Sequence, residues 1–223
     1  MARRDPRGPV GVSGAERLAA PAGVRLVLAR HGQTPSNVAR ALDTLPPGPG
    51  LTAEGRRQAE DLGADLAGEK VVAVRASRAT RAQQTAEPVA RHRGLPVEVS
   101  DGMQEIYVGD LEGSTDEESR RRFEEIYASW HFGELDRPMP GGESGRQALA
   151  RFLDAARVGL RGVTAGAVVL VSHGAVVRLV AARLTSVGAG RANAAYLPNA
   201  GRVVLEASDR EPTGWSCLRW DGL

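Results

Sequence analysis

Three pairs of polar residues in the sequence could together perform chemistry on a phosphate. Each pair directly follows a short apolar run: Arg30-His31, Ser77-Arg78 and Ser172-His173. A neutral imidazole can attack phosphorus, and guanidinium groups can bind phosphoryl oxygens through paired hydrogen bonds. Because phosphoryl transfer depends mainly on positioning and electrostatics, such residues gathered in one place would favour transfer through a histidine.

These pairs meet only if the apolar runs before them lie side by side. The runs 24–29, 71–76 and 167–171 are short and rich in β-branched residues, which is typical of strands buried on both faces. They alternate with segments of helical period, and this order predicts an α/β three-layer sandwich. We expect a mostly parallel central sheet with helices on both faces. In such sheets ligands bind beyond the carboxyl ends of the strands, where the polar pairs stand.

Other segments complete this plan. Thr52 is expected to cap a helix, and residues 41–50 are expected to form a loop because they contain three prolines and two glycines. Further helices are expected over 81–92, 115–130, 147–160 and 175–184. Further strands are expected over 97–100, 203–206 and 215–218. Pro88 is expected to kink or end its helix.

The segment Leu28–Asn37 contains Arg-His-Gly after a strand, then Thr and Asn, and resembles the histidine phosphatase superfamily, also called the phosphoglycerate mutase-like family. Further matches follow in the family's order: Leu51-Thr52, Gly55 and Gln58-Ala59; Ser77, Arg81-Ala82 and Thr85-Ala86; Glu105, Gly109 and Glu112-Gly113; Gly141-Gly142-Glu143-Ser144; and Val171-Ser172-His173-Gly174. They cover about residues 24–174. A single Arg-His-Gly would be a weak signal, but six ordered matches are a specific one.

The resemblance implies a role for each matching residue. His31 would be the nucleophile and would form a phosphohistidine. Arg30 and Arg81 would each offer a planar fork of donors to the phosphoryl oxygens. His173 would add a donor, and Asn37 would add a side-chain amide, unless it merely caps or turns the chain.

The leaving alkoxide needs a proton, and Glu105 matches the family position for that acid. It would then take a proton from the water that cleaves the phosphohistidine. Glu112 and Glu143 are other carboxylates that could hold this role. Gly32 and Gly174 would let the backbone approach closely.

Some assignments stay open on the sequence alone. Arg78 lies three residues before Arg81 and could share the phosphate role. His92 and His131 match no catalytic position of the family. The resemblance implies neither a metal nor a cofactor. A metal reading is also disfavoured by the residues themselves, because no close histidine pair is present and the arginines would repel a cation.

A phosphatase is favoured over a mutase by analogy. Mutases of the family carry a longer insertion than Ile106–Gly141 between the acid and the Gly-Glu-Ser segment, and they have a cationic C-terminal tail. Residues 105–109 also depart from the mutase-like Glu-Arg-His-Tyr-Gly. We therefore expect a metal-independent phosphomonoester hydrolase acting on a small phosphorylated metabolite. The alternatives are a phosphoglycerate mutase-like isomerase and a non-catalytic regulatory protein of the same fold.

Composition sets the wider limits. The 223 residues suit one domain, with a flexible tail at 1–22, a histidine phosphatase domain at 23–223 and a variable cap segment around 107–140. The net charge is +2, and only 4% of residues are aromatic, so no nucleic-acid partner is expected. One cysteine and the lack of a long apolar stretch predict a cytoplasmic protein without a membrane partner. The expected partner is a small phosphate ester; a homodimer stays open.

Overall fold

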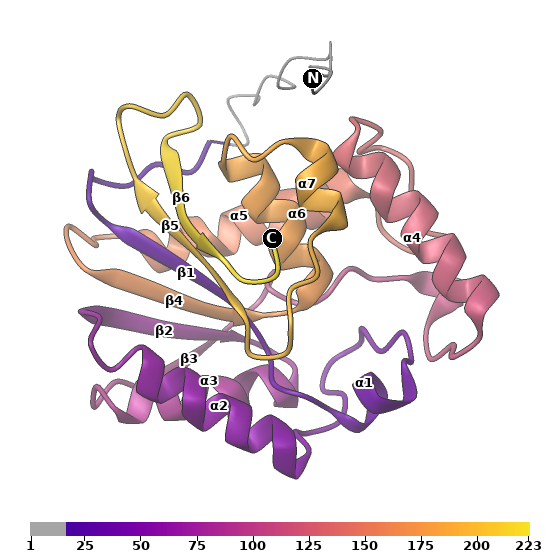
Figure 1. The fold of residues 1–223 in the computed structure, drawn as a ribbon, viewed down its shortest axis with the longest axis horizontal. Helices are drawn as coiled ribbons and strands as arrows, with labels where there is room; N and C mark the ends of the chain where they lie inside the picture. The colour runs from indigo at the N-terminus through magenta and orange to yellow at the C-terminus, as the bar shows by residue number, and fades with distance from the viewer. Residues whose placement is uncertain (1–16) are drawn as a thin grey trace, which may run out of the picture.

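A six-stranded sheet runs through the molecule in the order β3-β2-β4-β1-β5-β6 in this computed structural model, which describes residues 17–223 (Figure 1). The strands are β1 (Arg25–Arg30), β2 (Val71–Ser77), β3 (Val97–Ser100), β4 (Ala167–Ser172), β5 (Arg202–Ala207) and β6 (Trp215–Trp220). The pairs β1/β4, β4/β2 and β2/β3 are parallel, whereas β5 is antiparallel to β1 and β6 to β5. The expected mostly parallel α/β sheet is confirmed.

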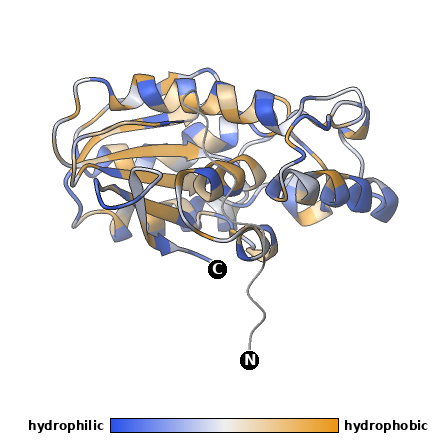
Figure 2. Cartoon of the chain, turned by 90° about the horizontal axis from the view of Figure 1, so that it is seen from above, coloured by the Kyte–Doolittle hydropathy of each residue, from blue (hydrophilic) through white to orange (hydrophobic). Residues whose placement is uncertain are grey.

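Helices cover both faces of this sheet. They are α1 (Pro35–Ala39), α2 (Ala53–Asp65), α3 (Thr80–Arg91), α4 (Glu117–His131), α5 (Gly145–Leu160), α6 (Gly174–Leu184) and α7 (Ala189–Ala194). Successive side chains of β1 point to opposite faces. Val27 packs in the cluster that contains residues of α2 and α3, and Leu28 packs in the cluster of α5 and α6. Figure 2 shows the resulting apolar strands between the helical layers.

Capping residues fix where the main helices begin. The Thr52 side chain accepts a hydrogen bond from the Gly55 N–H, so the predicted cap of α2 is confirmed. Ser144 and Gln147 form a capping box, which starts α5 at Gly145, two residues earlier than expected. Pro88 lies inside α3 and does not end it, since the helix continues to Arg91.

Two short helices were not expected from the sequence. Helix α1 follows the Arg-His-Gly segment and is closed at its start by a capping box of Thr34 and Asn37. Helix α7 has six residues. Neither is long enough to show a helical period, which explains why hydrophobic spacing did not predict them.

The beginning of the described chain differs from the predicted tail. Leu18 is only 3% exposed and belongs to the core cluster of α5 and α6. Its carbonyl accepts a 2.7 Å hydrogen bond from the indole N–H of Trp215. Leu18 and Ala20 therefore pack against the domain, and the rest of the predicted tail, 1–16, lies outside the described residues. Within 17–223, no helix is both long and apolar enough to cross a bilayer.

Candidate active site

A cavity of about 190 Å³ opens at the carboxyl ends of the parallel strands. Its wall contains six of the seven predicted site residues: Arg30, His31, Asn37, Glu105, His173 and Gly174. They come from segments that are far apart in sequence, as the expected sheet requires. The predicted cap segment contributes Val108 and Phe123 to the same wall.

His31 is held in one tautomer by the backbone that follows it. Its Nδ1 lies 2.7 Å from the Gly32 carbonyl oxygen. A carbonyl only accepts hydrogen bonds, so Nδ1 carries the proton. In the neutral ring the lone pair is therefore on Nε2, and the ring is 5% exposed on the cavity wall. This is the tautomer that a nucleophilic imidazole needs.

His173 is fixed by a serine from a neighbouring strand. The Ser77 hydroxyl lies 2.8 Å from His173 Nε2 and accepts a hydrogen bond from the Ala79 N–H at 3.3 Å. We assign the hydroxyl hydrogen to Nε2, which leaves the imidazole proton on Nδ1. Nδ1 is buried and has no hydrogen-bond partner in residues 17–223. It is thus available as a donor to an anion.

Both imidazoles are kept neutral by their surroundings. Burial lowers the pKa of His31 well below its ordinary value, and the charges of Arg81 and Arg30 lower it further. Burial also lowers the pKa of His173 well below its ordinary value, with His31 and Arg81 adding to the effect. The ring centroids are 5.1 Å apart, so a positive charge on either would disfavour one on the other.

A third buried histidine, His131, does not line the cavity and allows the effect of burial on a histidine pKa to be tested separately. Burial, with Arg178 and Arg183, lowers the pKa of His131 to about 4. Its ring packs edge-on to Tyr127, with centroids 4.9 Å apart. A histidine whose pKa is lowered by folding binds its proton more readily when unfolded, so its contribution to stability is lost as pH falls below about 6.5.

We predict that the free energy of unfolding decreases as pH falls from 7 to 5. The replacement His131→Phe keeps a ring and removes one titrating group, so it should reduce that slope by up to about 1.4 kcal/mol per pH unit. Urea unfolding of both proteins across this range measures the slopes. Equal slopes would show that His131 is not held neutral in the folded protein.

Arg30 is held by residues just before β5, which lie outside the matched motifs. One guanidinium nitrogen, Nη1, donates to the Leu197 carbonyl at 2.7 Å and to the Tyr196 hydroxyl at 3.2 Å. The Asn199 amide nitrogen donates to the His31 carbonyl at 3.2 Å and to the Asn37 side-chain oxygen at 3.0 Å. The stretch before β5 therefore fixes the positions of both Arg30 and His31.

Arg81 is buried beside the site and is not among the residues that line the cavity. Its side chain is 1% exposed, and Nη2 donates to the Asp43 carbonyl at 2.9 Å. Nη1 lies 3.7 Å from an oxygen of the Asp43 carboxylate, and neither atom has a hydrogen-bond partner in the described chain. Loop 41–50 covers the guanidinium: a Cβ at Gly48 would lie 2.3 Å from Nη1.

The Asn37 side chain caps α1 and leaves its amide nitrogen free for a ligand. Its oxygen accepts hydrogen bonds from the Thr34 N–H at 3.1 Å and from Asn199. Its side chain lies on the cavity wall, and capping uses the oxygen only. Arg78, by contrast, is 63% exposed and pairs with Asp101 at 3.2 Å, away from the cavity. Of the two arginines considered for the phosphate, Arg81 is the one near the site.

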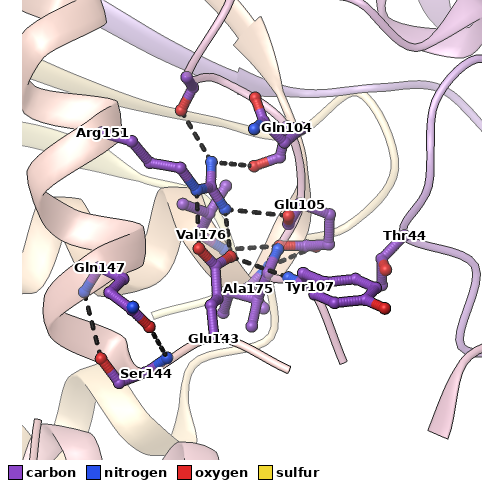
Figure 3. A network of polar contacts seen from close by, with 12 residues as sticks. Thr44, Gln104, Glu105, Tyr107, Glu143, Ser144, Gln147, Arg151, Ala175 and Val176 are labelled. Atoms are coloured by element: carbon purple, nitrogen blue, oxygen red, sulfur yellow. Dashed lines mark hydrogen bonds and ion pairs between the residues drawn. The ribbon is translucent and has the colours of Figure 1, made fainter. Parts of the chain in front are cut away.

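Glu105 is bound to the start of α6. Its two carboxylate oxygens accept hydrogen bonds from the N–H groups of Ala175 at 3.0 Å and Val176 at 2.9 Å, and one also accepts from Ile106 at 3.0 Å (Figure 3). A helix N-terminus favours a negative charge, so the backbone donors at the start of α6 stabilise the carboxylate form of Glu105.

The other two carboxylates considered for the acid role have structural partners. Glu112 accepts hydrogen bonds from the Thr44 N–H at 2.7 Å, from the Thr44 hydroxyl and from the Leu45 N–H at 3.3 Å, and thus holds loop 41–50. Glu143 accepts from the Tyr107 N–H at 2.8 Å and pairs with Arg151 through both oxygens. Neither of them lines the cavity.

Arg151 belongs to none of the matched motifs, yet it connects Glu143 to the backbone of residues 102–105 (Figure 3). Besides Glu143, its guanidinium donates to the backbone carbonyls of Gly102 and Gln104 at 2.7 Å and of Glu105 at 3.0 Å. All five N–H donors of the guanidinium are thereby used. The segment that carries Glu105 is fixed from α5 by one side chain.

We predict that Arg151→Met lowers the free energy of unfolding by about 3–5 kcal/mol, because it leaves the buried Glu143 carboxylate without its partner. The side chains of this pair are only 18% and 14% exposed. The control is Arg146→Met on the same helix, which breaks a pair with Asp136 that is 54% and 75% exposed and should cost less than about 1 kcal/mol. Urea unfolding compares the two; equal losses would contradict the role assigned to Arg151.

Gly32 is required by packing rather than by ligand approach. A Cβ at this position would lie 2.4 Å from the Gly55 carbonyl oxygen at the start of α2. The Gly32 N–H also donates to the Thr85 hydroxyl of α3 at 2.9 Å. The Arg-His-Gly segment is thus held against two helices, which fixes the backbone that carries His31. A Cβ at Gly174 would lie 3.1 Å from Arg30 Nε.

Among residues 17–223, no group of three or more histidine, cysteine, aspartate or glutamate side chains is arranged to hold a metal ion.

Several site residues were missed by sequence reasoning, chiefly Asp43, Arg151, Arg178 and the stretch Tyr196–Asn199. The stretch Tyr196–Asn199 could have been predicted. A strand antiparallel to β1 begins near the residue where β1 ends, so the residues just before β5 must lie at the same edge of the sheet as Arg30 and His31. Arg151 and Arg178 look like ordinary helical arginines, and only the tertiary structure distinguishes them.

The chain matches the model of the histidine phosphatase superfamily (branch 1) over residues 26–221. It is 31% identical to a metal-independent phosphoserine phosphatase of Arabidopsis thaliana, over 89% of this chain and 81% of that protein. It is 35% identical to a 2,3-bisphosphoglycerate-dependent phosphoglycerate mutase of Bradyrhizobium diazoefficiens, over 57% of this chain and 64% of the mutase. The chain spans less than two thirds of the length of the first curated relatives that it matches: 14% of one and 64% of the next.

A solved structure gives the same result for the fold. The native structure of the mycobacterial glucosyl-3-phosphoglycerate phosphatase Rv2419c superposes with a TM-score of 0.70 at 25% sequence identity, covering 89% of this chain and 99% of that chain. The family match extends from β1 to beyond β6 and so includes both histidines and the returning stretch before β5. The chain belongs to the histidine phosphatase superfamily.

Proposed function

We propose that this protein is a metal-independent phosphomonoester hydrolase that acts on a small phosphorylated metabolite through a phosphohistidine at His31. One observation carries the proposal. The hydrogen bond between His31 Nδ1 and the Gly32 carbonyl leaves the lone pair on Nε2, in a neutral ring on the wall of a cavity that also presents Arg30, His173 and Glu105. Relatives named as phosphatases support the reaction class.

The reaction takes two displacements at phosphorus. His31 Nε2 attacks the phosphorus atom, and the bond from phosphorus to the ester oxygen breaks. Arg30, His173 and the Asn37 amide would bind the phosphoryl oxygens, where charge develops in the transition state. Arg81 would add a buried positive charge close to His31, whose pKa it lowers.

Glu105 would move the proton in both steps. The approach of a phosphate dianion favours its protonated form, which then gives the proton to the departing alkoxide. The resulting carboxylate takes a proton from water as that water attacks the phosphohistidine, releasing phosphate and restoring neutral His31. The backbone donors of α6 stabilise the carboxylate in the second step.

A mutase is the second candidate, and the family includes relatives of that name. A mutase must keep its phosphohistidine away from water and retain the intermediate. The short segment Ile106–Gly141 favours hydrolysis, because it holds only α4 and one short turn of helix over the site. A non-catalytic role is disfavoured because the nucleophile, the phosphate donors and the acid are all present.

The test is phosphate release from a panel of phosphomonoesters, with chelator present, from mildly acidic to neutral pH. Release from one or several esters is expected. No release from any ester, combined with conversion of phosphoglycerate in the presence of a bisphosphate primer, would replace the phosphatase with the mutase. Inactivity in both assays would favour the non-catalytic role.

A further inference from the structure

A second arginine lies on the cavity wall without a role in the proposed reaction. Arg178 is half-buried and belongs to α6, the helix whose first turn binds Glu105 and whose N-cap is His173. It lines the same cavity as the catalytic residues. Arg178 belongs to none of the matched motifs, because it lies beyond the Ser-His-Gly segment on α6.

The Arg178 guanidinium is held in place by neutral groups. Its Nη1 donates to the Ala195 carbonyl, and its central carbon lies 4.8 Å from the centroid of the Tyr127 ring. Tyr127 is itself fixed, because its hydroxyl donates to the Ala175 carbonyl at 2.9 Å and its ring stacks on Phe123 with centroids 5.6 Å apart. The guanidinium is therefore pre-organised at a defined place on the wall.

No carboxylate neutralises this cation. Among residues 17–223, no aspartate or glutamate oxygen lies within 4.0 Å of the Arg178 guanidinium, whereas most arginines of the described chain have such a partner. A half-buried cation that faces a ligand cavity and lacks a counter-ion is suited to bind an anion. In the proposed reaction the phosphoryl group lies at His31 with Arg30, His173 and Asn37, which leaves Arg178 for a second anionic group of the substrate.

Helix geometry gives the spacing. Arg178 follows His173 by five positions, which corresponds to a rise of roughly 7–8 Å between their Cα atoms along the helix axis. The cavity volume of about 190 Å³ equals the volume of about six water molecules in the liquid. This space suits a phosphate and a chain of a few carbon atoms. The cavity wall also includes the apolar residues Leu42, Val108 and Phe123.

We propose that Arg178 binds a carboxylate on the leaving group, so that the substrate class is small phosphorylated carboxylic acids. This proposal rests on the proposed hydrolytic function. The carboxylate would form a charge-assisted, paired hydrogen bond with the guanidinium and would place the ester oxygen near Glu105. Selectivity would then come from one contact at the end of the substrate opposite the phosphate.

The test uses pairs of esters in which one member has the carboxylate and the other has a hydrogen atom or a hydroxymethyl group in its place. O-phosphoserine is compared with O-phosphoethanolamine, and 3-phosphoglycerate with glycerol 3-phosphate. Wild-type protein should prefer the acid of at least one pair by about 10- to 100-fold in kcat/KM, the range expected for one hydrogen-bonded charge pair. Arg178→Gln should reduce this ratio to about threefold or less, and Arg178→Lys should retain part of it.

The control is Arg191→Gln, which removes the same charge from an exposed position on α7 and should keep the wild-type ratio. The proposal is overturned if wild-type protein hydrolyses both members of each pair equally. It is also overturned if Arg178→Gln slows both members by the same factor, or if bisphosphates are preferred to the acids. Failure to hydrolyse any ester, including p-nitrophenyl phosphate, would instead reject the hydrolytic function itself.

Discussion

Replacing His31 with alanine is expected to lower kcat for phosphate release by at least about 10⁴-fold, because it removes the proposed nucleophile. His173 is a poor substitute, since we assign its proton to Nδ1 and its Nε2 lies 2.8 Å from the Ser77 hydroxyl. The loss should appear in kcat for every ester, independent of the leaving group. Steady-state phosphate release with each active ester measures it.

Two controls separate chemistry from folding. His92→Ala removes an exposed histidine at the end of α3 and should leave kcat within about threefold of wild type, as for a surface position. Circular dichroism should show that the His31→Ala protein is folded. A folded His31→Ala protein that keeps wild-type activity would contradict the nucleophile assignment.

The second large effect is expected from Glu105→Gln. With alkyl phosphates, whose leaving groups need a proton, the rate should fall by about 10²–10⁴-fold. With p-nitrophenyl phosphate the loss should be much smaller, because p-nitrophenolate leaves without protonation. The variant also loses one acceptor for the N–H groups of α6, so thermal unfolding should occur at a lower temperature.

Comparing the two classes of leaving group isolates the proton transfer, because a general loss of structure slows both alike. Glu124→Gln, on the exposed face of α4, is the matched control and should affect neither class. If Glu105→Gln slows alkyl and nitrophenyl esters by the same factor, Glu105 is not the acid, and its bonds to α6 have only a structural role.

Much of the fold follows from local patterns in the sequence. The strands at 71–77 and 167–172 are apolar runs, and α2 begins at the threonine that caps it. The parallel arrangement follows from the alternation of strands and helices, and it places the polar ends of the strands at one edge. Side chains placed by strand ends, such as His31 and His173, were therefore predictable.

Contacts made by loops and by distant helices could not be predicted in this way. Arg81 belongs to a matched motif, but its contacts with the loop that contains Asp43 could not be predicted. That loop has no hydrophobic period, so its sequence does not indicate where it packs. Arg151 uses all of its donors only because three carbonyls of residues 102–105 converge on it. The burial of Leu18 could not be predicted either, because it lies in a stretch rich in alanine and glycine without a regular hydrophobic pattern.

The most direct test of the central claim is to trap the phosphoenzyme. Wild-type protein mixed with an active ester and quenched in alkali should carry a phosphoryl group, stable to base and labile to acid, on the peptide that contains His31. The His31→Ala protein should carry none. The same label on His31→Ala protein, or a label on a wild-type peptide that lacks His31, would contradict transfer through His31.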